Sequence, residues 1–224
     1  MFWVKSQCLE ALQPLRNGNI EVIISSNGIY PNLDQYCDQY VYRHLDNSVG
    51  KTMNRGIRFA KGDNLILMAN DILLKPGAVE ECIEIVKNHP HHLSSPMYLN
   101  SRKYHEMPMV DGYHVNQRVG ADCVCMTRKQ FEDIGWFDEI MLVFDAVNYM
   151  NRWIKKGYST ILTKEIMATD LGKLGRSTNY RSYLGQAEQI GFIGYHSRRA
   201  KLNPTKEEVW KECLKPDSIL WQTL

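Results

Sequence analysis

The feature that most constrains the fold of this chain is a short apolar run with polar residues directly behind it. Residues 65–69 read LILMA, a continuous run of the kind found in strands covered by helices on both faces. The preceding segment, 50–60, places apolar residues at helical spacing. Together they predict an α/β sheet in which Asn70 and Asp71 stand at the carboxyl end of a buried strand, where open α/β sheets bind ligands.

The composition is that of an ordinary globular protein. A chain of 224 residues with 44% hydrophobic and 23% charged residues can form one sizeable core. A net charge of +2 gives no argument for a nucleic-acid or membrane partner. No apolar run approaches the ~18 residues of a transmembrane helix, and the first residues do not resemble a signal peptide. The six cysteines lack CxxC spacing, so we expect reduced thiols in a cytoplasmic protein.

Two consecutive sequences around the apolar run are typical of a known family. They read NRGI at 54–57 and AKGDNLILMANDILLKPGAVE at 60–80. This stretch resembles the nucleotide-sugar half of the family 2, GT-A type glycosyltransferases. In that family the strand ends in an Asp-x-Asp or Asn-x-Asp signature, which holds a divalent metal against the diphosphate of the sugar nucleotide. Here the triplet at 69–71 is Ala-Asn-Asp, with alanine at the first acidic position.

The resemblance implies roles on the donor side of a site. Asp71 would bind Mn²⁺ or Mg²⁺, while Asn70 and Asn54 would bind the nucleotide sugar. Residues 20–25 predict a β-strand rich in branched side chains. The next residue, Ser26, stands where the family has an Asp that reads uracil, so it too is implied in nucleotide-sugar binding. The family's first strand should precede this region, and we expect the sequence to begin after it, so that either the reading frame is short at its start or the sheet is rebuilt.

A second block of sequence extends the resemblance. Residues 121–127 predict a strand, and residues 128–135 predict a helix closed by glycine. The following WFDE resembles the "GGFDE" segment that comes next in the family. The resemblance therefore implies that Trp136, Asp138 and Glu139 line the acceptor site.

The family's acidic pair comes next and is reduced here to one carboxylate. Counting back from Arg152, Asp145 takes the Glu position and Ala146 the Asp position, while Asn148 replaces a later Asp. In inverting members a carboxylate near this helix start accepts the proton of the attacking hydroxyl, which is a poor nucleophile without such a base. Asp145 is the candidate catalytic base, and it could equally cap the helix that follows it.

Three further features have two interpretations each. Asp170 stands near the position of a histidine metal ligand of the family, and is either a substitute ligand or an exposed turn residue. His89, His91 and His92 form either a metal cluster or, as we expect, a solvated loop. Residues 93–118 have little pattern, and either contact an anionic acceptor or form an exposed connecting segment.

The sequence predicts a division at the end of the resemblance. Residues 1–171 would form the GT-A domain, a Rossmann-like mixed α/β sheet flanked by helices. Residues 172–224 would form a basic, aromatic and partly helical extension packed on it. The loop 172–178 could close on a diphosphate, but it lacks the GxxxxGK[ST] spacing of a P-loop. The basic and aromatic residues beyond it indicate either a nucleic-acid surface or solvated arginines.

The resemblance implies a glycosyltransferase, a hexosyl- or pentosyltransferase, that moves a sugar from a nucleoside-diphosphate sugar to an acceptor hydroxyl with inversion and metal assistance. The acceptor would be a glycan, a lipid-linked sugar or modified DNA. Two alternatives stay open at this point. One is a catalytically inactive binding module on the GT-A scaffold, because several acidic positions are lost and fold does not fix function. The other is a DNA-modifying glycosyltransferase that acts on hydroxylated phage bases.

Overall fold

The computed structural model describes residues 8–16, 18–26, 29, 32–43, 49–99, 107–116, 122–139 and 145–170. The extension expected at 172–224 therefore lies outside the described residues. Residues 8–12 are helical, and the elements that follow are η1 (Gln13–Leu15), β1 (Ile23–Ser26), η2 (Asp34–Tyr36), β2 (Gln39–Tyr42), α2 (Val49–Phe59), β3 (Asn64–Met68), β4 (Ile72–Leu74), α3 (Ala78–Asn88), β5 (His92–Tyr98), β6 (Met109–Val110), β7 (Tyr113–Asn116), β8 (Cys123–Thr127), α4 (Arg128–Ile134), α5 (Asp145–Lys155) and β9 (Ser159–Asp170).

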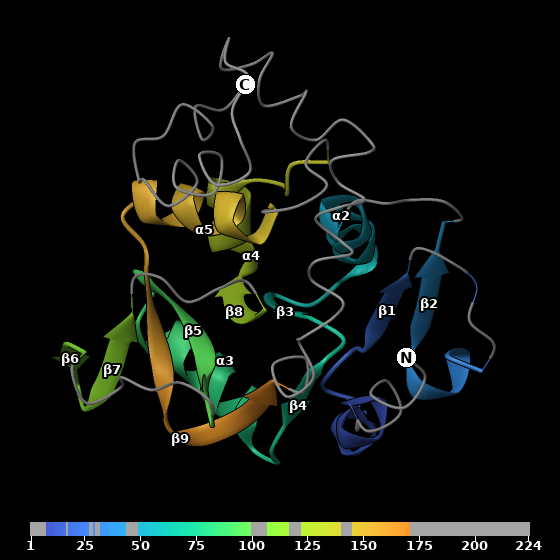
Figure 1. The fold of residues 1–224 in the computed structure, drawn as a ribbon, viewed down its shortest axis with the longest axis horizontal. Coiled ribbons are helices and arrows are strands. Elements are labelled where there is room, and N and C mark those ends of the chain that lie inside the picture. The colour runs from blue at the N-terminus through green and yellow to red at the C-terminus, as the bar shows by residue number, and fades with distance from the viewer. Residues whose placement is uncertain are drawn as a thin grey trace, which may run out of the picture.

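The strands form two sheets (Figure 1). The larger has seven strands in the order β3-β8-β5-β9-β7-β6, with β4 paired to β9 beside this path. It is a mixed sheet, because β5 and β9 are parallel while β8 runs antiparallel to both β3 and β5. The smaller sheet is the parallel pair β1–β2. The expected mixed α/β sheet flanked by helices is confirmed.

Helices cover the larger sheet on both faces. On one face, α2, α4 and α5 enclose a core in which Trp153 and Tyr149 are fully buried beside Leu65 and Leu67 of β3. On the other, α3 packs with β4, and Leu12 and Leu15 from the first helical segment lie against this second core. Residues of β3 alternate between the two cores, as a strand covered on both sides requires.

The expected connecting segment at 93–118 is only partly correct. Its first part is β5, which lies in the middle of the larger sheet, with every residue from Leu93 to Tyr98 buried. The strand escapes sequence prediction because it contains two serines and a proline. The hydroxyl of Ser94 donates to the carbonyl of Cys82 (2.7 Å) and that of Ser95 to the carbonyl of Cys123 (2.8 Å). These bonds satisfy hydroxyl groups that would otherwise be costly to bury.

The cysteines of the described residues are free and buried, as expected of reduced thiols. Burial raises the pKa of Cys125 to about 12, so this thiol stays protonated near neutral pH. Among the described residues, no helix has the length and apolar character needed to cross a membrane.

Candidate functional site

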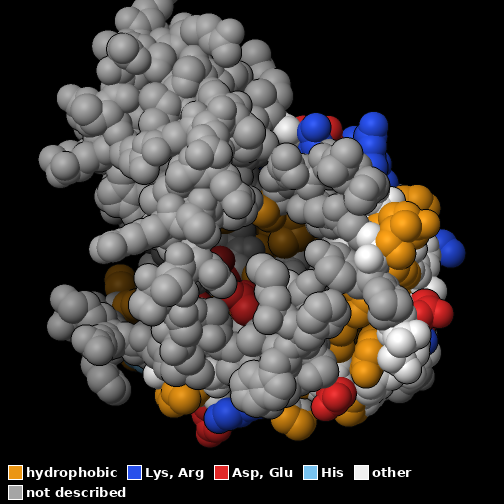
Figure 2. Space-filling model, turned by 45° about the vertical axis from the view of Figure 1, so that its right-hand side comes forward, with side chains coloured by type: hydrophobic (Ala, Val, Ile, Leu, Met, Phe, Trp, Pro, Cys, Tyr) orange, Lys and Arg blue, Asp and Glu red, His pale blue; other side chains and the backbone are white. Residues whose placement is uncertain are grey.

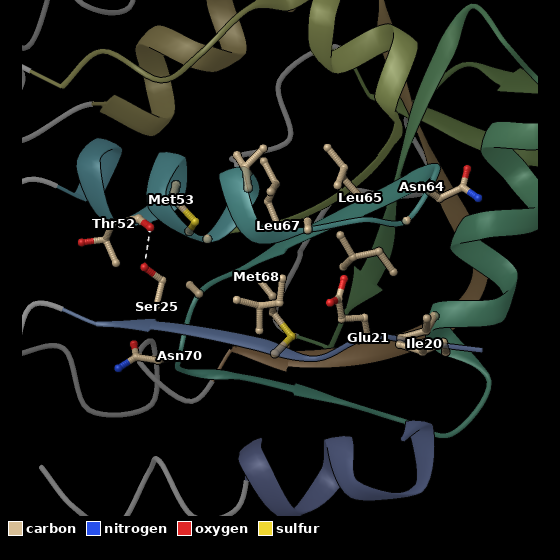
Figure 3. Close-up of a pocket in the computed structure, with 18 of the residues that line it drawn as sticks. Ile20, Glu21, Ser25, Thr52, Met53, Asn64, Leu65, Leu67, Met68 and Asn70 are labelled. Atoms are coloured by element: carbon tan, nitrogen blue, oxygen red, sulfur yellow. Dashed lines mark hydrogen bonds between the residues drawn. The ribbon is translucent and has the colours of Figure 1, made fainter. Parts of the chain in front are cut away.

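A cavity of about 760 Å³ lies between β1, α2 and β3 (Figure 3). Ser26, at the end of β1, and Asn70, just after β3, both line it. Figure 3 shows Ser25 and Asn70 at one end of the cavity and Glu21 and Asn64 at the other, so β1 and β3 run in the same direction. Two residues predicted for the donor side are therefore brought to the carboxyl ends of two strands that face one cavity.

Two carboxylates predicted as metal ligands come from neighbouring strand ends. The antiparallel β4–β9 register pairs Ile72 with Asp170, so Asp71, the residue before Ile72, comes beside the end of β9. Asp170 is not an exposed turn residue, since only 1% of its surface is accessible. Its charge acts on the buried Tyr98, whose pKa is raised mainly by burial and further by Cys123, Asp122 and Asp170.

The oxygen donors at this strand end suit a hard divalent cation. Mg²⁺ in particular is usually held by one or two carboxylates together with substrate phosphates. The described residues contain no group of three or more His, Cys, Asp or Glu side chains that could hold a metal by themselves. Asp71 and Asp170 alone would leave most of the coordination positions of such a cation to other ligands. Figure 2 shows acidic side chains recessed in the molecular surface, with hydrophobic side chains near them.

The helix α2 fixes the end of β1. The hydroxyl of Ser25 donates to the carbonyl of Thr52 (2.7 Å), as the dashed line in Figure 3 marks. The guanidinium of Arg55 donates to the carbonyl of Ser26 (2.8 Å). The hydroxyls of Ser26 and Tyr40 are 2.9 Å apart. The position of Ser26 is thus set by α2 on one side and by β2 on the other.

The opposite side of α2 holds the segment 135–139. Asn54 is 1% exposed, and its amide nitrogen donates to the Phe137 carbonyl (3.0 Å) and to Oε1 of Glu139 (2.9 Å). Its amide oxygen accepts the Phe137 N–H (2.9 Å). The structure therefore places Asn54 between α2 and the predicted acceptor residues, with its amide engaged within the protein.

Predicted acceptor residues meet a cation on α2. Trp136 is 46% exposed, and the guanidinium of Arg58 lies 5.4 Å from the centre of its ring. Arg58 also forms a salt bridge of 3.2 Å with Glu139. A cation over the face of an indole ring is attracted by the ring's electrons. No sequence motif singles out Arg58, which is one of several cations on the polar face of the predicted helix.

The acidic-pair region begins the helix α5. Asp145 is its first residue, and the side chain of Asp145 lies outside what the structure describes. Ala146 packs against the core of the α2 face. The side chain of Asn148 is buried and accepts a hydrogen bond from Arg152 Nε (3.1 Å). Burial lowers the pKa of Arg152, while the charges of Tyr149 and Asp138 act against this shift.

Comparison with known proteins accounts for this arrangement. Residues 6–174 match the model of the family described as Glycosyl transferase family 2. The chain belongs to this family. Its fold is the GT-A fold, and the resemblance stated from the sequence is confirmed. A search of curated proteins returned no match.

Solved structures share the fold at low sequence identity. The S. aureus TarS 1–349 crystal structure aligns with TM-score 0.59 and 10% identity, covering 76% of this chain and 57% of TarS 1–349. The mannosyltransferase PcManGT from Pyrobaculum calidifontis, in complex with GDP-Man and Mn²⁺, aligns with TM-score 0.62 and 10% identity, covering 87% of this chain and 60% of PcManGT. A structure of TarS 1–349 with UDP-GlcNAc aligns with TM-score 0.54 and 10% identity, covering 72% of this chain and 52% of that one. The family 2 chain therefore spans between half and two thirds of the length of these proteins.

Proposed function

We propose that this family 2 protein is a glycosyltransferase that transfers a sugar from a nucleoside-diphosphate sugar to an acceptor hydroxyl, with inversion at the anomeric carbon. The observation that carries the proposal is the convergence of Ser26, Asn70, Asp71 and Asp170 on neighbouring strand ends of a GT-A fold. Ligands of open α/β sheets bind at this edge. Similar structures bind donors of this class, namely UDP-GlcNAc in TarS and GDP-Man with Mn²⁺ in PcManGT.

On the donor side, polar groups would contact the nucleotide and acidic groups would bind the metal. Ser26 and Asn70 would contact the nucleotide, and Asp71 with Asp170 would hold Mn²⁺ or Mg²⁺. When bound, such an ion offsets the negative charge that develops on the departing diphosphate. Asn54 would support the site by fixing the segment 135–139, because its amide is already bonded there.

The acceptor side would lie along the segment 135–139 and the start of α5. Trp136, Asp138 and Glu139 would line it, and Asp145 would act as the base. The acceptor oxygen forms a bond to the anomeric carbon as the bond from that carbon to the diphosphate oxygen breaks. The acceptor proton passes to the Asp145 carboxylate, and the nucleoside diphosphate leaves.

The substrates are proposed only as chemical classes. The donor carries a hexose or a pentose, and the acceptor is a glycan or a lipid-linked sugar, met in the cytoplasm. Modified DNA is the third acceptor class, and its sequence support is in residues 172–224, outside the described residues.

A catalytically inactive binding module is the second candidate. The contacts of Ala146 and Asn148, which replace acidic residues of the family, favour it. Ala146 is partly buried and packs against the core of the α2 face, and Asn148 is bonded to Arg152. Both residues therefore help to hold α5 in place, as would be expected in a scaffold that no longer catalyses a reaction.

The first prediction concerns metal-dependent binding of the donor. Thermal unfolding of the full chain would be followed with UDP or GDP, with and without Mn²⁺. At about 100 times its Kd a ligand adds ~2.7 kcal/mol of stability, which corresponds to roughly 5–10 °C for a chain of this size. We expect a shift of this order with one of the nucleotides and Mn²⁺, and we expect Asp71→Asn to remove its Mn²⁺-dependent part.

The matched control for this experiment is Asp63→Asn. Asp63 also lines the cavity and is exposed, but it precedes β3 and so lies at the amino end of the strand. Asp63→Asn should leave the shift unchanged. Equal Mn²⁺-dependent shifts in the wild type and Asp71→Asn would remove Asp71 from the metal site.

A further inference from the structure

The strand β8 brings one more carboxylate to the strand ends of the proposed donor side. Because β8 runs antiparallel to β3, its first residues lie beside the last residues of β3. The register pairs Met68 with Cys123, and the next pair is joined by a hydrogen bond of 2.7 Å from the Ala69 N–H to the Asp122 carbonyl. Asp122, which is partly buried, therefore stands directly across from Ala69.

This pairing places Asp122 beside the position at which the family's signature has its first acidic residue, which here is Ala69. Residues directly opposite each other in an antiparallel pair project to the same face, with Cβ atoms about 5 Å apart. The side chain of Asp122 thus starts about one strand spacing from where a carboxylate at position 69 would start.

The charge of Asp122 acts on the same group as that of Asp170. Burial is the main cause of the raised pKa of Tyr98, the last residue of β5, and the charges of Cys123, Asp122 and Asp170 raise this pKa further. β5 lies between β8 and β9 in the sheet, so the two carboxylates act on the phenol from the strands on its two sides. Like charges repel each other, and a cation bound near them relieves that repulsion.

We propose, on the basis of the proposed function, that Asp122 supplies from β8 the carboxylate that the signature lacks at Ala69, and that it helps to bind the divalent cation of the donor complex. Such a cation is usually held by one or two carboxylates together with substrate phosphates. Among the described residues, no three acidic side chains form a metal site without further ligands. We therefore expect Asp122 to act when the metal and the diphosphate are bound together.

No sequence pattern singles out Asp122. It precedes its strand, whereas the ligand-binding residues of an α/β sheet are expected after one. It reaches the carboxyl ends of β3 and β5 only because β8 runs antiparallel to both of them. The direction of a strand cannot be read from its apolar run, so this residue is found only in the folded chain.

Isothermal titration calorimetry of the full chain tests this role without any need for turnover. UDP and GDP would each be titrated, with and without Mn²⁺, into the wild type and Asp122→Asn. We expect Asp122→Asn to weaken the Mn²⁺-dependent binding by roughly 10- to 100-fold, as the loss of a group that supports a metal usually does. Equal affinities in the two proteins would overturn the role of Asp122 alone. No Mn²⁺-dependent binding to the wild type would overturn the metal-assisted function, and this role with it.

A rescue experiment tests the link between positions 69 and 122. Ala69→Asp in the Asp122→Asn background should restore most of the lost affinity, because the two residues face each other and neighbouring substitutions are not additive. Ala69→Asn in the same background is the matched control, since it has the same shape without the charge, and it should restore nothing. Equal affinities of the two double variants, at equal thermal midpoints without ligand, would contradict the proposal. If Ala69→Asp lowers the midpoint, the comparison of the wild type with Asp122→Asn still decides.

Discussion

At the scale of single residues, Asn54 shows how the amide of a motif position can be bonded within the protein. Its place in the NRGI sequence predicts a role on the nucleotide side. In the structure its amide makes three hydrogen bonds to Phe137 and Glu139, residues more than 80 positions later in the chain. These bonds join α2 to the predicted acceptor segment.

Substitution of Asn54 should therefore affect stability strongly. Asn54→Ala leaves the buried Phe137 N–H and carbonyl without their partner, which costs roughly 2–4 kcal/mol in the free energy of unfolding. Urea unfolding measures this cost as a lower midpoint at unchanged slope. Asn70→Ala, which removes an exposed asparagine, should stay within about 0.5 kcal/mol of the wild type. A similar small change for Asn54→Ala would show that the three bonds contribute little.

The sequence predicts some residues of the candidate site and misses others for a physical reason. Asp71 and Asp170 were predicted as separate features, and the β4–β9 register brings their strand ends together. Only the family resemblance points to Asp170. The sequence pattern alone does not distinguish a buried aspartate at the end of a strand from an exposed aspartate in a turn. Arg58 gives no signal at all, since its contact with Trp136 depends on packing between α2 and the segment after α4.

At the scale of elements, prediction succeeds where local patterns and tertiary burial agree. The helix expected at 50–60, the strand at 65–69 and the helix at 128–135 are each observed within one residue of those bounds. Prediction fails at β5, where Ser94 donates to a carbonyl of α3 and Ser95 to a carbonyl of β8, contacts that no local pattern indicates. Residues 159–170 form one twelve-residue strand, β9, which ends at Asp170.

The packing of α2 provides a test at this scale through two of its glycines. A Cβ at Gly50 would overlap the backbone carbonyl oxygen of Asp138, whereas a Cβ at Gly56 would make an ordinary contact of 3.4 Å with Ser25 Cβ. Gly50→Ala should therefore destabilise the protein by about 1–3 kcal/mol, the usual cost of overpacking. Gly56→Ala should be neutral or stabilising by up to ~1 kcal/mol, because alanine favours the helix.

Thermal or urea unfolding of the two variants decides the matter, since both make the same chemical change in one helix. Equal stabilities would mean that α2 does not approach the 137–138 segment as closely as the structure places it.

At the scale of the whole molecule, one helix of the GT-A fold, α2, lies between the proposed donor side and the proposed acceptor side. β1 and Ser26 are bonded to one side of α2, and Phe137 and Glu139 to the other. The same architecture would suit an enzyme or a binding module, because the scaffold supports both. The two differ in one requirement, which is a carboxylate that accepts the acceptor's proton.

The last prediction separates these two functions through Asp145, the first residue of α5. If Asp145 is the base, Asp145→Asn should lower turnover by roughly 10²- to 10⁴-fold, the usual contribution of general-base catalysis. Asparagine caps helices about as well as aspartate, so stability should change little. Nucleotide binding should also persist, because the metal side of the site depends on β3 and β9 instead.

If Asp145 only caps α5, Asp145→Asn should change neither activity nor stability, whereas Asp145→Ala should lower the free energy of unfolding by ~1 kcal/mol. Comparing Asn with Ala thus separates the loss of a base from the loss of a cap. Unchanged turnover in Asp145→Asn, measured with a donor and acceptor that the wild type uses, would exclude Asp145 as the base, and no turnover in the wild type with any donor that it binds would favour the binding module.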